Sequence, residues 1–204
     1  MNKKNKAILL DRDGVINELV ISPEEGIVDS PNSSDQLKII KNSIKAMKIL
    51  ANLGYKLVII SNQPGIAKGY YDTSEFFKIK RNLEDELTKN NIILSGQYYC
   101  LHHPNAKMIK YRKKCQCRKP GTKLFFDAIK EHNIDTKKSF LIGDGITDMQ
   151  LAKKVRCRAI FIGNINSAVT RVFHEKKINP FYVSHDLLEA ANYIRKLEKR
   201  QILT

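Results

Sequence analysis

Short, almost continuous apolar runs recur along the chain, and each ends in polar residues and glycine. Ala7–Leu10, Lys56–Ile60 and Phe140–Ile142 are the clearest of these runs. Apolar runs of this length, bounded by turn-forming residues, are typical of strands that are buried on both faces. Between the strands, apolar residues recur at helical spacing, as at Leu37, Ile40, Ile44, Met47 and Leu50, before Gly54 ends the pattern.

The alternation of these two patterns predicts an α/β fold. The expected strands are Ala7–Leu10, Lys56–Ile60, Tyr98–Leu101, Ser139–Gly143, Ala159–Ile162 and Phe181–Val183. The expected helices are Leu37–Leu53, a segment from Thr73 or Ser74 through Leu87, Leu124–His132, Thr147–Val155 and Asp186–Lys199.

Two acids follow the first strand, in the segment Asp11-Arg12-Asp13-Gly14. Side chains two residues apart in an extended segment point the same way, so both carboxylates face one crevice at the strand's carboxyl end. Like charges at close range require a cation or a shared proton. The pattern favours a Mg²⁺-dependent phosphoryl-transfer site, while an ordinary solvated turn remains the alternative at this point.

Three further polar segments follow other predicted elements. They are Ser61-Asn62-Gln63, Arg118-Lys119-Pro120, and Gly143-Asp144-Gly145 with Asp148 beyond it. The hydroxyl and amide could hold a phosphate oxygen, the acids could hold a metal, and the two cations sit beside a proline that stiffens the backbone. The ordered set indicates a phosphate site more specifically than any one segment.

In this order, the four segments resemble the motifs of the haloacid dehalogenase-like phosphatases. The resemblance runs from Ala7 to about Ala159 and implies a Rossmann-like, doubly wound, mostly parallel sheet. The stretches between the motifs leave no room for a large cap domain, so we expect a minimal cap. It also implies that Asp11 is the nucleophile that forms an aspartyl-phosphate and that Asp13 is the general acid and base.

The same resemblance assigns the remaining site residues. Mg²⁺ would be held by Asp11, Asp144 and the backbone carbonyl of Asp13, and Ser61 and Lys119 would hold the transferring phosphoryl oxygens. Substrate contacts are expected from Asn62, Gln63 and Arg118. Asp148 is expected to steady its loop or Lys119. The chain departs from the family at Gly145, where a lysine is usual, and in the segment Glu18–Ser34.

Three cysteines and a histidine lie in two close pairs, Cys100 with His102 and Cys115 with Cys117. This is a normal donor set for a closed, structural Zn²⁺ site, although His103 could take the place of His102. Cys115 and Cys117 are too close in sequence to pair comfortably as a disulfide. Such an ion would fix the loop of about residues 99–119, which carries Arg118 and Lys119.

The Cys-x-His-His-Pro segment, the insert Pro104–Lys114 and Cys-x-Cys-Arg-Lys-Pro resemble one subgroup, the D-glycero-D-manno-heptose-1,7-bisphosphate 7-phosphatases. The resemblance implies hydrolysis of the 7-phosphate of a small phosphorylated sugar in surface-polysaccharide biosynthesis. The enzyme alternative is a histidinol-phosphate phosphatase or another small phosphomonoesterase. The related histidinol phosphatases share the metal ligands but typically have a shorter connecting loop.

Composition adds limits to this interpretation. A chain of 204 residues with 42% hydrophobic residues suits a single compact domain over residues 1–204. No apolar run is long enough to span a bilayer, and Asn2–Lys6 opens polar with no signal-peptide core, so we expect a cytoplasmic protein with no membrane partner. The oligomeric state is not readable from the sequence, and a monomer is favoured.

The net charge of +15 leaves three interpretations open. The basic run at Lys107, Lys110 and Arg112–Lys114, beside Tyr111, allows a zinc-bearing nucleic-acid binding protein, the non-enzyme alternative. The charge could also steer an anionic substrate toward the site. The third interpretation is a compositional bias with lysines scattered over the surface. Nucleic acid is the least favoured of the three.

Overall fold

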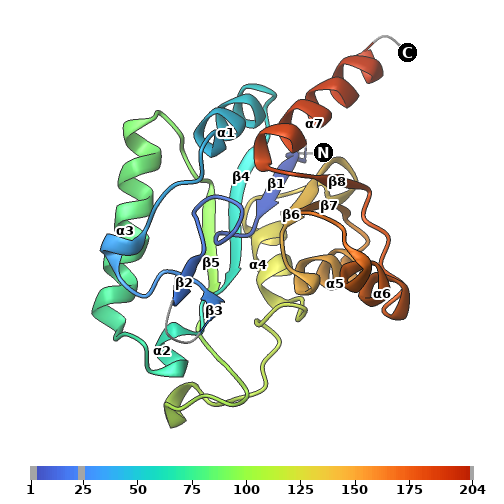
Figure 1. Ribbon diagram of the computed structural model, residues 1–204. Coiled ribbons are helices and arrows are strands. Elements are labelled where there is room, and N and C mark those ends of the chain that lie inside the picture. The colour runs from blue at the N-terminus through green and yellow to red at the C-terminus, as the bar shows by residue number, and fades with distance from the viewer. Residues whose placement is uncertain (1–3, 23–25, 203–204) are drawn as a thin grey trace.

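Six parallel strands form the central sheet of the computed structural model, in the order β5–β4–β1–β6–β7–β8 (Figure 1). The structure describes residues 4–22 and 26–202. The strands are β1 (Ala7–Leu10), β2 (Val20–Ser22), β3 (Ile27–Asp29), β4 (Lys56–Asn62), β5 (Gly96–Cys100), β6 (Phe140–Gly143), β7 (Arg158–Ile162) and β8 (Tyr182–Ser184). The α-helices are α1 (Ser43–Asn52), α2 (Gly65–Lys68), α3 (Thr73–Lys89), α4 (Lys123–Glu131), α5 (Ile146–Val155), α6 (Ser167–Glu175) and α7 (Leu187–Ile202).

Helices cover both faces of the sheet because alternate strand residues point to opposite sides. In β1, Ile8 and Leu10 belong to one apolar cluster together with residues of α1, α3 and α7. Ala7 and Leu9 belong to a second cluster, which includes residues of α4, α5 and α6. This three-layer arrangement confirms the predicted doubly wound α/β fold.

The strand register aligns the predicted functional segments at one edge of the sheet. Leu10, the last residue of β1, pairs with Ile59 of β4 on one side and with Ile142 of β6 on the other. The residues that follow β1, β4 and β6 therefore lie together at the carboxyl edge of the sheet. Because β1 lies between β4 and β6, the strand order reverses at β1. Open α/β sheets bind ligands at such a topological switch point.

The prediction that a helix begins at Leu37 is wrong, because α1 begins at Ser43. Residues 37–40 instead run alongside the segment after β1: the Glu18 amide donates to the Lys38 carbonyl at 2.8 Å, and the Ile40 amide donates to the Ile16 carbonyl at 3.0 Å. Asn42 then adopts a left-handed φ of 71° before α1 starts. The backbone of this segment is therefore bonded to the active-site loop.

Some described elements were not predicted. The antiparallel hairpin of β2 and β3 and the helix α6 carry no strong pattern in the sequence, and α2 was expected only as a turn. In the hairpin, Ile21 and Val28 are well exposed. Among the described residues, no helix is both long and apolar enough to cross a membrane.

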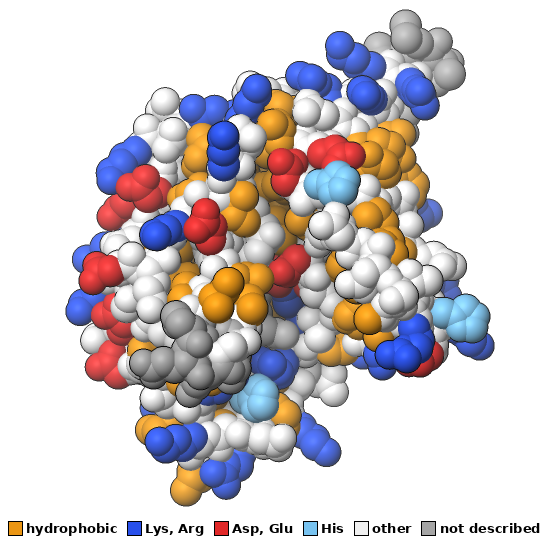
Figure 2. All heavy atoms as spheres, in the orientation of Figure 1, with side chains coloured by type: hydrophobic (Ala, Val, Ile, Leu, Met, Phe, Trp, Pro, Cys, Tyr) orange, Lys and Arg blue, Asp and Glu red, His pale blue; other side chains and the backbone are white. Residues whose placement is uncertain are grey.

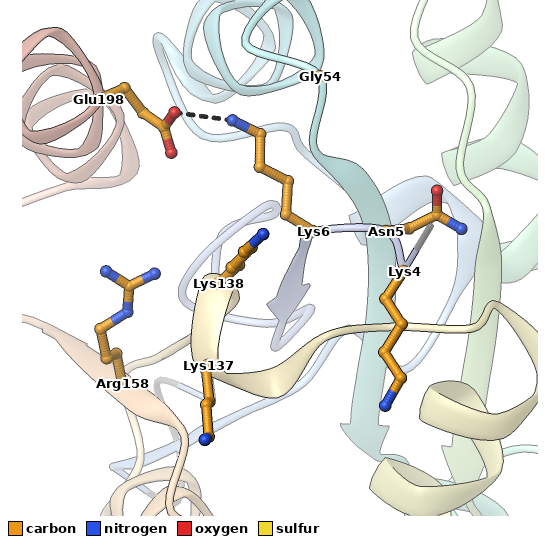
Figure 3. Close-up of a pocket in the computed structure, with 8 residues that line it drawn as sticks. All are labelled: Lys4, Asn5, Lys6, Gly54, Lys137, Lys138, Arg158 and Glu198. Carbon is orange, nitrogen blue, oxygen red and sulfur yellow. Dashed lines mark hydrogen bonds and ion pairs between the residues drawn. The ribbon is translucent and has the colours of Figure 1, made fainter. Parts of the chain in front are cut away.

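Charged side chains are spread over the visible face of the molecule. Figure 2 shows Lys and Arg side chains interspersed with Asp and Glu on that face, without one continuous basic surface. At the amino edge of the sheet, opposite the carboxyl ends of the strands, a cavity is lined by several cations (Figure 3). The cavity and the carboxyl edge are thus two separate places on the fold.

Candidate active site

Three carboxylates from different segments meet at the carboxyl edge of the sheet. Asp11 follows β1, Asp144 follows β6, and Asp148 lies in the first turn of α5. One oxygen from each lies within 4.8 Å of the others. Carboxylate oxygens are the ligands that Mg²⁺ prefers, so this cluster is a candidate metal site.

Lys119 is the cation nearest to these acids. Its Nζ lies 2.7 Å from Asp11 Oδ2 and 2.6 Å from Asp148 Oδ1, and the residue is almost fully buried. Burial lowers the pKa of Lys119, but the two carboxylates outweigh this effect, so its pKa is raised. Lys119 is therefore held charged beside Asp11, and its role in holding a phosphoryl oxygen stays a prediction.

The acids in this cluster carry more negative charge than Lys119 can neutralise. Burial, and next the charge of Asp11, raise the pKa of Asp144 to about 7. Burial also raises the pKa of Asp148, against the opposing effect of Lys119. A divalent cation at Asp11 and Asp144 would relieve this repulsion, so the donor set fits Mg²⁺.

Gly14 allows the Asp144 carboxylate to lie against the loop after β1. A Cβ placed on Gly14 would lie 2.0 Å from Asp144 Oδ2, and the φ of Gly14 is +73°. Both the space and the backbone conformation therefore require glycine. The D-x-D-G pattern predicted the turn, but the approach of Asp144 is visible only in the structure.

Asp13 points into a set of hydrogen-bond donors. Its Oδ1 accepts from Arg12 Nε and Asn17 Nδ2, each at 2.9 Å, and its Oδ2 accepts from Gln63 Nε2 at 2.5 Å. Burial raises the pKa of Asp13, but the Arg12 guanidinium and these hydrogen bonds outweigh it, so the pKa is lowered. Asp13 is therefore held ionised in this state.

Arg12 and Asn17 were missed by the sequence analysis. Both are fully buried, and Arg12 adds an ion pair from Nη2 to Asp13 Oδ1 at 2.9 Å. Arg12 stands between Asp11 and Asp13 in the sequence, and these two acids were the available signal for it. Nothing in the sequence pattern indicated that Asn17 would turn back to Asp13.

Three consecutive residues at the end of β4 and just after it, Ser61, Asn62 and Gln63, make different contacts at the site. Ser61 is buried, and its Oγ accepts a hydrogen bond from Gln63 Nε2 at 3.0 Å. Asn62 bonds to the backbone of Lys119, and Gln63 is fully buried against Asp13. The structure thus brings all three predicted residues to the site, with the amides of Asn62 and Gln63 engaged by protein groups.

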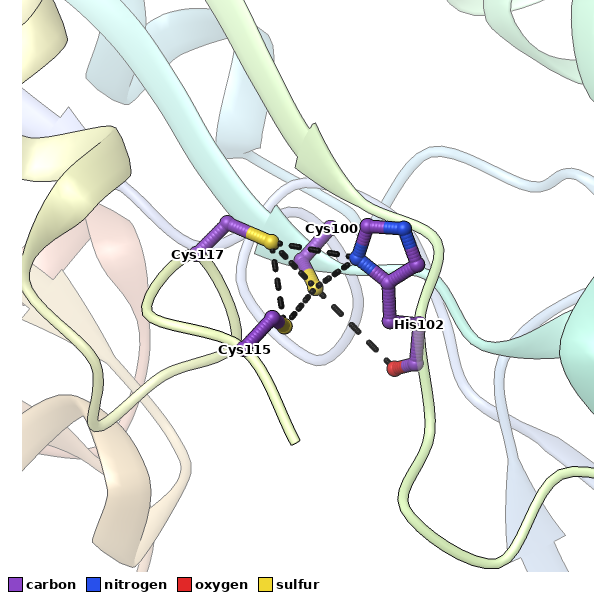
Figure 4. Close-up of side chains that lie close together, drawn as sticks. All are labelled: Cys100, His102, Cys115 and Cys117. Atoms are coloured by element: carbon purple, nitrogen blue, oxygen red, sulfur yellow. Dashed lines mark hydrogen bonds between the residues drawn. The ribbon is translucent and has the colours of Figure 1, made fainter. Parts of the chain in front are cut away.

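Cys100, His102, Cys115 and Cys117 converge beside the site (Figure 4). Their ligand atoms all lie within 4.8 Å of one another, and five of the six separations run from 3.1 Å, between Cys115 Sγ and Cys117 Sγ, to 3.8 Å, between Cys100 Sγ and His102 Nδ1. A tetrahedral metal with M–S bonds of about 2.3 Å separates its sulfur ligands by about 3.8 Å. The cluster is therefore able to bind a metal ion, and it uses Nδ1 of His102.

His103, the alternative ligand, lies outside the cluster. Its Nδ1 accepts a hydrogen bond from the Asn105 amide at 3.2 Å, and its backbone pairs with Arg112. Cys157 is also separate, and all four cysteines are free thiols. Arg118 is half-buried and donates from Nη1 to the His102 carbonyl at 3.3 Å, which ties it to the cluster's loop.

Known proteins resemble this chain over most of its length. The HAD-hydrolase-like family model matches residues 116–190. The D-glycero-beta-D-manno-heptose-1,7-bisphosphate 7-phosphatase of Pasteurella multocida is 34% identical over 193 residues, which cover 95% of this chain and 98% of the relative. The protein of the same name from Photorhabdus laumondii is 40% identical over 146 residues, which cover 72% and 73%. The chain belongs to this heptose-bisphosphate phosphatase family of haloacid dehalogenase-like enzymes.

Solved structures have the same fold as this chain. The D,D-heptose 1,7-bisphosphate phosphatase from B. bronchiseptica, solved with magnesium and phosphate, superposes with a TM-score of 0.76 at 24% identity, covering 94% of this chain and 98% of that one. Family membership confirms the resemblance stated from the four motifs and makes the chain a phosphoric monoester hydrolase. It also supports magnesium as its cofactor.

Gly145, where the family usually has a lysine, immediately precedes α5 as its N-cap residue. Its amide donates to Asp148 Oδ2 at 3.2 Å, and a Cβ at this position would lie 2.8 Å from the same oxygen. Asp148 Oδ1 meanwhile bonds to Lys119, as described above. Asp148 therefore contacts both the turn at Gly145 and Lys119, the two places where the sequence analysis expected it to act.

Proposed function

We propose that this chain is a Mg²⁺-dependent phosphatase that removes the 7-phosphate of D-glycero-D-manno-heptose 1,7-bisphosphate, in surface-polysaccharide biosynthesis. The observation that carries the proposal is the cluster of Asp11, Asp144 and Lys119 in a chain that the Pasteurella multocida relative matches over 95% of its length. Because those relatives are named for the beta anomer, we expect preference for that anomer.

Mg²⁺ would be held by the carboxylates of Asp11 and Asp144 and by the backbone carbonyl of Asp13. When bound, it neutralises negative charge on the acids and on the phosphoryl group. Burial, and next the charge of Asp11, raise the pKa of Asp144 to about 7, so a cation beside these two carboxylates would stabilise the ionised form of Asp144. Lys119 and Ser61 would hold phosphoryl oxygens during the transfer.

Asp11 would attack phosphorus with one carboxylate oxygen, which forms an acyl-phosphate bond as the bond to the sugar oxygen breaks. Asp13 would donate a proton to that leaving oxygen and later accept one from the water that hydrolyses the acyl phosphate. The donors around Asp13 favour its ionised form, so it must gain a proton first. The negative charge of an arriving phosphate ester would favour that protonation.

Asn62 and Gln63 would act through other residues, since their amides bond to the Lys119 backbone and to Asp13. Arg118 is half-buried, so part of its side chain is accessible for a contact with the substrate. The contacts therefore support Asn62 and Gln63 as positioning residues. A small phosphorylated sugar remains the proposed partner.

The Cys₃His cluster would hold a structural Zn²⁺ with no open coordination position. Burial raises the pKa of the Cys100 thiol, so ionised sulfurs at these distances need a cation to be stable. Reduced thiols suit a cytoplasmic location, and we propose a monomer working there.

Phosphate release with Mg²⁺ tests the activity. Substrates are both anomers of the heptose bisphosphate, histidinol phosphate and a 3′-phosphorylated oligonucleotide, each with wild type and Asp11→Asn. We expect Asp11-dependent turnover of the beta heptose anomer above the others. Turnover of histidinol phosphate alone would keep the chemistry and overturn the substrate. Oligonucleotide binding that survives Asp11→Asn, without turnover of any ester, would favour the nucleic-acid alternative.

A further inference from the structure

A cavity of about 780 Å³ lies at the amino edge of the sheet (Figure 3). Its size falls in the range of pockets that bind small molecules, roughly 300 to 1,000 Å³. It is lined by Lys4, Asn5, Lys6, Gly54, Lys137, Lys138, Arg158 and Glu198. The lining comes from the residues before β1, the end of the α1–β4 connection, the turn before β6, the start of β7, and α7.

The charge of this lining is strongly unbalanced. Five cations face one acid, Glu198, and that acid is already engaged. Lys6 Nζ pairs with Glu198 Oε2 at 2.8 Å, and the Tyr55 hydroxyl donates to Glu198 Oε1 at 2.5 Å. Within the described part of the chain, Lys138 has no side-chain hydrogen bond or ion pair, and Arg158 acts on Glu198 through its charge without a direct ion pair. Lys6 and Arg158 therefore share one acid, which leaves positive charge available for an external anion.

Arg158 is held in place at one wall of the cavity. Its guanidinium carbon lies 3.9 Å from the centre of the Phe140 ring and 5.7 Å from that of Phe181. Its Nε is buried and has no hydrogen-bond partner within the described part of the chain. A guanidinium fixed by aromatic stacking loses less freedom on binding an anion than an exposed one does.

Figure 3 shows Arg158, Lys138 and Lys6 around one open space, with Glu198 at its border. The amines of Lys4 and Lys137 extend away from Glu198, at the rim. Two cations facing one cavity from different elements, with a third beside them, can contact several oxygens of one ligand. A ligand with more than one negative charge would use this arrangement best.

This cavity is separate from the phosphatase site. Lys6 precedes β1 and Asp11 follows it, so the four residues of that strand lie between the two places. At about 3.3 Å per residue, the strand spans about 13 Å. A substrate phosphate at Asp11 does not reach Arg158, and the cavity's cations are not part of the proposed catalytic machinery.

We propose that this cavity binds a small anion bearing several phosphate groups, such as an oligophosphate. The concave shape and the several cations that line the cavity favour a compact ligand. A nucleic acid strand would instead require a basic groove that continues beyond the cavity. The proposal is independent of the identity of the phosphatase substrate.

Binding of inorganic tripolyphosphate to the full-length, zinc-replete protein tests the proposal, by calorimetry in Mg²⁺-free buffer at fixed ionic strength. The pocket variants are Lys138→Glu and Arg158→Gln. The control is Lys176→Glu, which makes the same charge change as Lys138→Glu at an exposed lysine after α6. Circular dichroism and Tm without ligand establish that each variant is folded, and Lys138→Glu is at an exposed position.

We expect Lys138→Glu to weaken binding by about tenfold or more, because it replaces attraction by repulsion at close range. The control should stay within about twofold, since a distant surface charge is screened. Tripolyphosphate should raise the Tm of wild type more than that of either pocket variant. Equal affinity of wild type and both folded pocket variants would overturn the proposal. Tighter, pocket-dependent binding of a 20-nucleotide single strand would replace the small anion by nucleic acid.

Discussion

Asn62 holds the backbone of Lys119 with both ends of its side-chain amide. The Lys119 amide donates to Asn62 Oδ1 at 2.8 Å, and Asn62 Nδ2 donates to the Lys119 carbonyl at 3.2 Å. Asn62 also pairs with Cys100 in the sheet, and Cys117 of the same thiol cluster lies two residues before Lys119. The buried lysine is thus fixed from β4 on one side and from the Cys₃His cluster on the other.

Replacing Asn62 by Ala removes one of these two supports. We expect kcat to fall by about 10- to 100-fold, because small displacements of a group that contacts the reacting phosphate are costly. The Asp11–Lys119 ion pair should persist in a folded protein. Steady-state kinetics with the preferred ester, together with Tm, check this. A change confined to Tm, with kcat and KM unaltered, would refute the positioning role.

Removing the other support tests the proposed zinc. Cys117→Ser should lose the bound metal and lower activity by more than about tenfold at saturating Mg²⁺, because the loop that carries Lys119 loses its anchor. Metal analysis of the purified protein and the phosphatase assay measure both effects.

Cys157→Ser is the matched control, since Cys157 is a buried thiol outside the cluster. It should retain one zinc per chain and nearly full activity. Equal zinc content in the two variants would contradict the proposed ligand set.

The two supports of Lys119 also show which features of the site could be predicted from the sequence. The six strands of the central sheet and the acids that follow two of them could be predicted from short apolar runs and from the D-x-D-G pattern, because these are local signals. Asn62 was predicted to contact substrate, and its partnership with Lys119 was hidden because the two residues are 57 positions apart. A hydrogen bond at that separation depends on the fold as a whole.

The prediction of a helix over the segment before α1 was wrong for a related reason. Leu37 and Ile40 fit a helical spacing, but their backbone groups bond to the loop after β1 instead of to a helical turn. Tertiary pairing overrode the local pattern, and Asn42, with its left-handed backbone, marks where the helix can begin. Arg12 was likewise invisible as a partner of Asp13, because neighbours in sequence rarely face each other in a strand.

Glu198 gives the stability of the fold a dependence on pH. Burial raises its pKa, but Lys6 and the Tyr55 hydroxyl outweigh this, so the pKa is lowered. A lowered carboxylate pKa means stability that is present above the unfolded value of about 4.3 and is lost as the pH falls through the folded value.

Glu198→Gln should therefore lower the free energy of unfolding by about 1 kcal/mol at pH 7, with the difference from wild type shrinking on acidification below about pH 4. Urea unfolding at several pH values measures it. Glu86→Gln, which removes an exposed pair with Lys89, is the control and should change stability little. A gap that stays constant down to acid pH would contradict the role given to the Glu198 carboxylate.

A comparison of Gly14 with Gly26 distinguishes the steric effect of a side chain at the metal site from the effect of backbone strain. In Gly14→Ala, the new methyl would overlap the Asp144 carboxylate and displace it from Asp11. Gly26 has a similar positive φ of 62°, but no described atom lies within 4 Å of a Cβ placed there. Both variants share the cost of a left-handed alanine, about 1 kcal/mol, and only Gly14→Ala disturbs the acids.

We therefore expect Gly14→Ala to lower kcat/KM by about 100-fold or more and to raise the Mg²⁺ concentration needed for half-maximal rate, because the displaced acid is a proposed ligand. Gly26→Ala should show a slightly lower Tm with near wild-type kinetics. Mg²⁺ titrations of the initial rate distinguish the two. If both variants lost activity to the same degree, strain alone would explain the loss, and the close approach of Asp144 to Gly14 would not matter for metal binding.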